Sequence, residues 1–376
     1  MPVDSLDAIG DLLAAQPDVA AARPQKLLNA LTAFVTANED AARSPNYAKA
    51  TPDDLEPAAA LLGSPAVKAN DALLVRVLKC CKILSRKYDN RVGLGATVVD
   101  DLVDVLHADV ADDVAGEAAN VVLNICYERE NVARLVDAGG VPPLVAYLGS
   151  SNAELQANAA GAIQSICFQK EGRAHARDLG AIEGVLPLLS SPSLKVRKRA
   201  QFLVGARNSS STRAILRRAI RPTRRPRHSR APQVQTRAVG AVHNMSSEPE
   251  AIKIVRRLGG IGPLVALLRA PSAAVCGSAA GALQNLSREA AARKEARELG
   301  AIVPLGDLLF GTVVQSQVCA AGAILNILGP ELGAEVESNK QRRGLKKLLS
   351  LAITLGMLHD SLSAEVAEGR RRAEQT

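Results

Sequence analysis

The side chains that could carry out chemistry are five histidines, six cysteines and a row of regularly spaced asparagines. The histidines are scattered, and none lies near a cysteine or an acid at the spacing of metal ligands. No glycine-rich phosphate loop and no strand pattern is evident. The cysteines fall inside helical patterns without C-x-x-C spacing, which favours buried, reduced thiols. Nothing therefore argues for a catalytic constellation, and we expect a protein that is not an enzyme, with no cofactor and no metal site.

The asparagines belong to a motif that recurs with a fixed period. Gly281-Ala282-Leu283-Gln284-Asn285-Leu286-Ser287 has one copy upstream, at 240–246, and another at the same distance downstream, at 322–327. Two further copies, around Asn124 and Ser165, are separated by the same interval. A period of roughly 40 residues indicates a stack of repeated helical units.

The motif asparagine, taken as position zero, is the strongest site candidate. Its carboxamide offers one acceptor and two donors. A row of such amides can pair with successive backbone groups of an extended ligand. The alternative is that the amides bond to neighbouring helices and hold the stack, and both roles can coexist. The predicted row consists of Asn124, Ser165, Asn244, Asn285 and Asn326, in which Ser165 reaches least far.

Helical geometry assigns the other motif positions to two faces. At 100° per residue, positions −6, −2 and +1 form one apolar stripe, with alanine at −6 in every copy. Positions −4 and −7 are expected on the exposed face of the asparagine. Position −4 holds Asn120, Gly161, Gly240, Gly281 and Gly322, which predicts a smooth groove open to a close-lying backbone. Position −7 holds Glu117, Asn158, Arg237, Ser278 and Cys319, a row without consistent charge that argues against a strongly charged ligand.

Each clear repeat consists of a short helix, a glycine turn, a short apolar helix and the long motif helix. The turn glycines, Gly139, Gly180, Gly259 and Gly300, predict left-handed C-terminal caps. Residues 1–52 are expected to form a helical cap, residues 53–330 the repeat array and residues 331–376 a C-terminal cap and tail. Within the array, residues 53–107 predict two less regular repeats.

This three-helix unit, its turn glycines and its Ala-Ala-Gly-Ala-Leu-x-Asn-Leu-Ser pattern resemble the armadillo repeat. The resemblance covers residues 110–330 strongly and 53–110 weakly. It implies an all-α, right-handed α-solenoid whose third helices line a groove that typically binds an extended peptide or a partner protein. Nuclear-import adaptors of this class carry tryptophan at position −4. This chain has no tryptophan, so cation–π capture of a basic peptide is not expected.

The resemblance therefore predicts a monomeric, non-enzymatic scaffold that binds a protein or an extended peptide. An armadillo-like exchange factor for a small GTPase or a heat-shock ATPase is the alternative, because exchange needs no catalytic side chain. The chain has no run of about 18 apolar residues, so membrane insertion is not expected. We expect a cytoplasmic protein that can also reside in the nucleus.

The repeat pattern fails around residues 205–232. From Gly184 to Ser247 there is no acid, and 14 lysines and arginines lie between Lys195 and Arg237. The spacing from Ser165 to Asn244 falls slightly short of two intact repeat periods. Three explanations stay open: a sequence or gene-model error, a basic loop that binds nucleic acid or an acidic tail, and a nuclear-import signal. Nucleic-acid binding is expected only if the window 195–237 is genuine.

Overall fold

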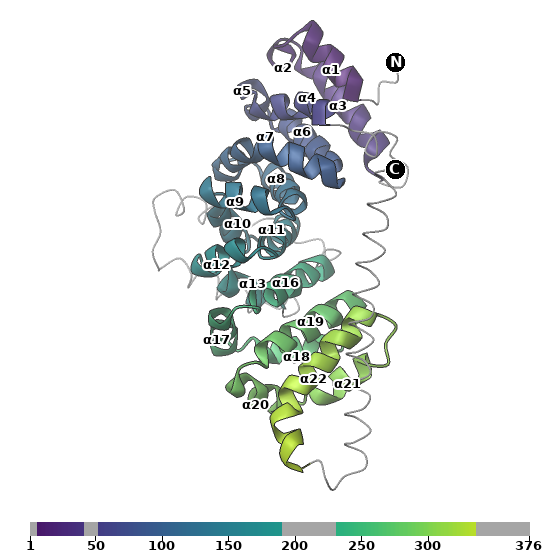
Figure 1. Cartoon of the computed structure of the whole chain (residues 1–376). Coiled ribbons are helices and arrows are strands. Elements are labelled where there is room, and N and C mark those ends of the chain that lie inside the picture. Colours follow the sequence, from purple (N-terminus) through teal and green to yellow (C-terminus); the bar gives the residue numbers. More distant parts are fainter. Residues whose placement is uncertain (1–5, 41–51, 190–230, 336–376) are drawn as a thin grey trace, which may run out of the picture. The chain divides into compact units, whose positions relative to one another are not determined.

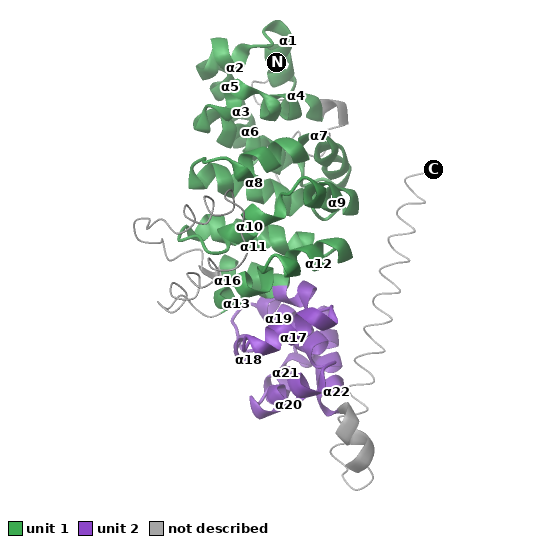
Figure 2. Cartoon of the chain, turned by 90° about the vertical axis from the view of Figure 1, so that its left-hand side faces the viewer, with its two compact units in different colours: residues 1–241 green, residues 242–376 purple. Residues whose placement is uncertain are grey.

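The computed structural model describes residues 6–40, 52–189 and 231–335. The chain divides into two compact units, residues 1–241 and 242–376 (Figure 2). Every regular element in the described ranges is a helix, which confirms the all-α fold predicted from the sequence (Figure 1). Over the same ranges, no helix has the length and apolar character needed to cross a membrane.

The first unit begins with irregular helical pairs and continues into regular repeats. Its first helices are α1 (Leu6–Ala15), α2 (Val19–Ala22), α3 (Pro24–Asn38), α4 (Pro52–Gly63), α5 (Pro65–Lys68) and α6 (Asp71–Leu84). A single 20-residue helix, α7 (Tyr88–His107), then takes the place of two short helices and precedes α8 (Asp112–Ile125). The regular repeats follow as α9 (Arg129–Asp137), α10 (Val141–Tyr147) and α11 (Ala153–Ile166), then α12 (Lys170–Asp178), α13 (Ala181–Leu189) and α16 (Ala231–Met245).

The second unit begins within α16, at residue 242, and continues with two three-helix repeats. They are α17 (Pro249–Arg257), α18 (Ile261–Leu267) and α19 (Ala273–Leu286), then α20 (Ala290–Glu298), α21 (Ile302–Leu308) and α22 (Val314–Glu335). The predicted C-terminal cap beyond residue 335 lies outside the described residues, and the predicted domain boundaries stay predictions.

The motif helices bury the stripe that their periodicity predicted. The alanines at position −6 are fully buried, and the residues at −2 and +1 are at most 1% exposed. Alanine at −6 leaves room for neighbouring backbones to approach, while the larger side chains at −2 and +1 fill the space between helices. Within each unit, this stripe is the core that joins one repeat to the next.

The predicted left-handed caps are also present. Gly139, Gly180, Gly259 and Gly300 have φ between 71° and 83°. Gly139 N–H donates to the carbonyl of Val136, and Gly140 N–H donates to that of Leu135. These paired bonds satisfy the last carbonyls of the first helix and reverse the chain into the second.

Between Ser165 and Asn244 the described residues supply one repeat, made of α12, α13 and α16. Arg237 of α16 donates to Asn158 of α11, so these two motif helices are direct neighbours. The disrupted repeat predicted around residues 205–232 lies outside the described residues as far as residue 230, as does the basic segment 195–230.

Candidate partner-binding face

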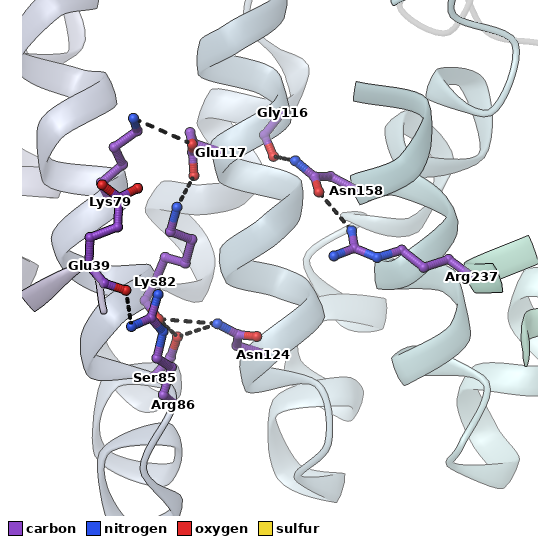
Figure 3. Close-up of polar contacts among 10 residues, drawn as sticks. All are labelled: Glu39, Lys79, Lys82, Ser85, Arg86, Gly116, Glu117, Asn124, Asn158 and Arg237. Carbon is purple, nitrogen blue, oxygen red and sulfur yellow. Dashed lines mark hydrogen bonds and ion pairs between the residues drawn. The ribbon is translucent and has the colours of Figure 1, made fainter. Parts of the chain in front are cut away.

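The motif asparagines bond to the preceding motif helix through their Nδ2 atoms. Asn124 donates to the Lys82 carbonyl and to Ser85 Oγ, both at 3.1 Å (Figure 3). In the second unit, Asn285 donates to the His243 carbonyl at 3.2 Å and Asn326 donates to that of Gln284 at 2.9 Å. The stack-holding role considered from the sequence is therefore present in both units.

The same amides leave their oxygen atoms available. The Oδ1 atoms of Asn124, Asn285 and Asn326 accept no hydrogen bond from the described residues, and all three side chains are half-buried. An acceptor whose amide is held by its nitrogen has a fixed direction, which lowers the entropy lost when a ligand binds. Asn244 is half-buried as well.

Several other predicted face residues are not at the surface. Ser165 is 2% exposed, Asn158 6% and Cys319 4%, so their expected exposure is wrong. Asn158 instead links three helices: its Nδ2 donates to the Gly116 carbonyl at 2.9 Å, and its Oδ1 accepts from Arg237 at 2.7 Å (Figure 3). Glu117, Asn120, Arg237 and Ser278 remain half-buried and accessible.

The predicted smooth glycine groove is also wrong. A Cβ atom on any of the four position −4 glycines would overlap a side chain at position −1 of the preceding motif helix. The covering pairs are Leu123 on Gly161, Gln164 on Gly240, His243 on Gly281, and Gln284 on Gly322. The glycines therefore accommodate the neighbouring repeat, and the half-buried side chains at −1 cover them. The −1 positions were missed because single-helix geometry does not reveal contacts between successive repeats.

Helix α6 is a further motif helix that the sequence patterns did not identify. Asn124 bonds to Lys82 and Ser85, whereas Asn285 bonds to His243 and contacts Ser246 Oγ at 3.5 Å. This equivalence places Ile83 at position zero. The register was hidden because isoleucine replaces asparagine, although Ile83 lies one full repeat period before Asn124.

The register of α6 adds cationic side chains to the face. Arg76, Lys79 and Lys82 occupy positions −7, −4 and −1. Lys82 Nζ lies 3.1 Å and Lys79 Nζ 3.9 Å from the Glu117 carboxylate (Figure 3).

We call the residues at positions −7, −4, −1, 0 and +3 of the motif helices the third-helix face.

Two more arginines of this face bond to neutral groups. Arg86, at position +3, donates to the Asn38 and Glu39 carbonyls at 3.3 and 2.9 Å (Figure 3). Arg237 donates to Asn158 and to the Ala157 carbonyl, and within the described residues it has no carboxylate partner. Burial lowers the pKa of the Arg237 guanidinium, but its ordinary value is so high that the group stays charged.

The described residues show no arrangement for metal or nucleophilic chemistry. No group of three or more histidine, cysteine or acidic side chains in these ranges could hold a metal ion. The six cysteines are buried and form no disulfide. Burial raises the pKa of the Cys81 thiol to about 12, which disfavours the reactive thiolate. The available chemistry is hydrogen bonding and charge pairing on the third-helix face.

Comparisons with known proteins agree with this architecture. The family model for the armadillo/beta-catenin-like repeat matches residues 129–168 and 248–288. A search of curated proteins found no match. The crystal structure of an engineered protein is similar over 73% of this chain and 97% of its own, with 27% identity and a TM-score of 0.57.

Designed armadillo repeat proteins are similar as well. One shares 21% identity over 74% of this chain and all of its own length, with a TM-score of 0.57. Another, in complex with the peptide (KR)4, shares 22% identity over 73% of this chain and 99% of its own, with a TM-score of 0.54. These similarities confirm the predicted α-solenoid fold.

Proposed function

This chain is an armadillo-repeat protein, and from that premise we propose that it is a non-enzymatic scaffold that binds an extended segment of a partner protein on its third-helix face. The face offers fixed hydrogen-bonding groups and charges without a catalytic constellation. The designed armadillo protein in complex with a peptide supports this use of the fold.

The observation that carries the proposal is the division of roles within the motif amide. Nδ2 is held by the preceding helix, and Oδ1 remains available as an acceptor at Asn124, Asn285 and Asn326. Packed helices lie roughly 8–10 Å apart, and an extended chain advances about 3.3 Å per residue. Within one unit, successive amide oxygens can therefore meet a backbone N–H at about every third residue of a ligand.

The test separates the ligand-facing oxygen from the stack-holding nitrogen. The variant Asn124→Ala/Asn285→Ala removes Oδ1 and Nδ2 of both amides. The matched control Ser85→Ala/Ser246→Ala removes an acceptor of Nδ2 in each unit and keeps every amide oxygen. Proteins retained on immobilised wild type are identified by mass spectrometry, and their affinities for both variants are measured at matched thermal stability.

We expect the asparagine variant to lose at least tenfold in affinity, since two hydrogen bonds of roughly 1 kcal/mol each disappear. The serine variant should bind within about twofold of wild type. Equal binding by the wild type, the asparagine variant and the serine variant would contradict the proposal. Equal losses in both variants would show that the asparagines act only through the stack.

A further inference from the structure

The first unit carries an excess of positive charge on its third-helix face. Helix α6 contributes Arg76, Lys79 and Lys82 at positions −7, −4 and −1, Arg86 follows its C-cap, and α16 contributes Arg237 at −7. At 100° per residue, positions −7, −4 and −1 span about 120°, so these three side chains share one side of α6. Figure 3 shows the lysines directed toward α8.

Among the described residues, one carboxylate of this face pairs with these cations. Glu117 lies against Lys82 and Lys79, with its side chain 12% exposed. Arg86 and Arg237 bond to backbone carbonyls and an amide, and Arg76 has no ion-pair partner among the described residues. One carboxylate therefore faces five cations, and most of the positive charge is not neutralised within the described part of the unit.

The nearest acids on the same helices lie toward the other end. Asp71, Asp113 and Glu154 occupy the first turns of α6, α8 and α11. Asp71 precedes Lys82 by about three helical turns, or about 16 Å, which exceeds the screening length of about 8 Å at physiological salt. Glu39 lies beside Arg86, to which it offers its backbone carbonyl. The C-terminal half of α6 thus remains basic.

We infer that the partner segment bound to the first unit is an acidic, extended peptide with carboxylates at two anchor points. One anchor is opposite Arg76, Lys79 and Lys82 on α6, next to Arg86, and the other is opposite Arg237 on α16. This inference rests on the proposed function, because it specifies the ligand of the same face. It reverses the expectation that the face has no preferred charge, because that expectation included only the five motif copies and not α6.

The helix spacing sets the distance between the anchors. Helices α6, α8, α11 and α16 follow one another, so three intervals of roughly 10 Å separate the two cationic sites. An extended peptide covers this distance with about nine residues. Between the anchors the face presents neutral amides, among them Asn120, Asn124 and Gln164. The basic peptide (KR)4, which accompanies one designed relative, would meet like charge here.

The experiment uses the full chain and three labelled peptides in fluorescence anisotropy. Each has a Ser-Gly spacer of about eight residues between two end pairs, which are Glu-Glu, Gln-Gln or Lys-Lys. We expect the glutamate peptide to bind at least tenfold more tightly than the lysine peptide, and its affinity to fall between about 50 and 200 mM NaCl. Equal affinity of the three peptides, or no binding of the glutamate peptide at about 1 mM, would overturn the inference.

A variant that replaces two cations by neutral side chains tests where the peptide binds. Arg76→Gln/Lys79→Gln removes two cations and leaves Lys82 to pair with Glu117. Arg129→Gln/Lys170→Gln makes the same change in charge on exposed residues of α9 and α12. The first variant should weaken glutamate-peptide binding about fivefold, and the control should leave it within about twofold. Equal effects would contradict the assignment of the site to α6.

The outcome also separates this inference from the proposed function. A captured partner that depends on Asn124 and Asn285 but not on Arg76 and Lys79 would leave the scaffold role standing and refute the acidic ligand. A partner that depends on neither pair would refute both.

Discussion

The side chain of Gln235 donates from Nε2 to the backbone carbonyl of Leu189 at 2.9 Å, although 46 residues separate them. In the uninterrupted repeat, Gln156 makes the same bond to Leu148, eight residues away, at 2.8 Å. The bond joins the second helix of a repeat to its third helix. Helix α16 therefore completes the repeat that α12 and α13 begin, and residues 190–230 lie between α13 and α16 in the sequence.

This equivalence predicts that two substitutions destabilise the protein in the same way. Gln235→Ala should lower the free energy of unfolding by about 1 kcal/mol, because the Leu189 carbonyl loses its donor. Gln156→Ala should cost at least as much, because Gln156 donates to the Leu148 carbonyl and also to that of Ser150, at 3.2 Å. Urea denaturation of the full chain measures both values. A neutral Gln235→Ala beside a destabilising Gln156→Ala would show that α16 does not close the repeat as α11 does.

Residues 190–231 should be dispensable for folding. In the intact repeat, Gly149-Ser150-Ser151-Asn152 connects the second and third helices, and Asn152 caps α11 by accepting from Glu154 N–H at 2.9 Å. Replacing residues 190–231 with Gly-Ser-Ser-Asn keeps Gln235 in register. We expect the melting temperature to change by less than about 4 °C, measured by circular dichroism. Loss of cooperative unfolding would contradict this prediction.

The sequence correctly predicted the features that are determined within a single helix or turn. The buried stripe and the turn glycines recur at a fixed spacing, and each follows from helical geometry alone. The third-helix face was predicted less well, because its exposure depends on side chains from the preceding repeat. Gly281 is predicted to be open from its own helix, but His243 of the preceding motif helix covers it. Helix α6 has isoleucine at position zero, so the asparagine pattern does not reveal its register.

Two glycines of the second unit isolate the contribution of backbone conformation. A Cβ at Gly259 or at Gly262 would meet nothing within 4 Å, but only Gly259 has a positive φ, of 71°. Gly259→Ala should therefore destabilise the protein by about 1 kcal/mol. Gly262→Ala lies within α18 and should stabilise it by about 0.5–1 kcal/mol. Equal effects in chemical denaturation would refute the cap assignment.

His243 should make the stability of the second unit depend on pH. Burial lowers the pKa of its imidazole, which covers Gly281. Above roughly pH 6.5 the imidazole is neutral in both the folded and the unfolded chain. As the pH falls below that value, the unfolded chain binds a proton that the folded chain resists. The free energy of unfolding should therefore decrease with acidification until the pH passes the lowered pKa.

His243→Gln should weaken this pH dependence, because glutamine already covers the glycine at the equivalent places, Gln164 on Gly240 and Gln284 on Gly322. The free energy of unfolding is compared at about pH 7.5 and 5.5 by urea denaturation, on either side of the ordinary histidine pKa. Adding Gln284→His to the variant places a buried imidazole one repeat later and should restore the acid sensitivity. An unchanged difference between the two pH values in His243→Gln would show that another group titrates.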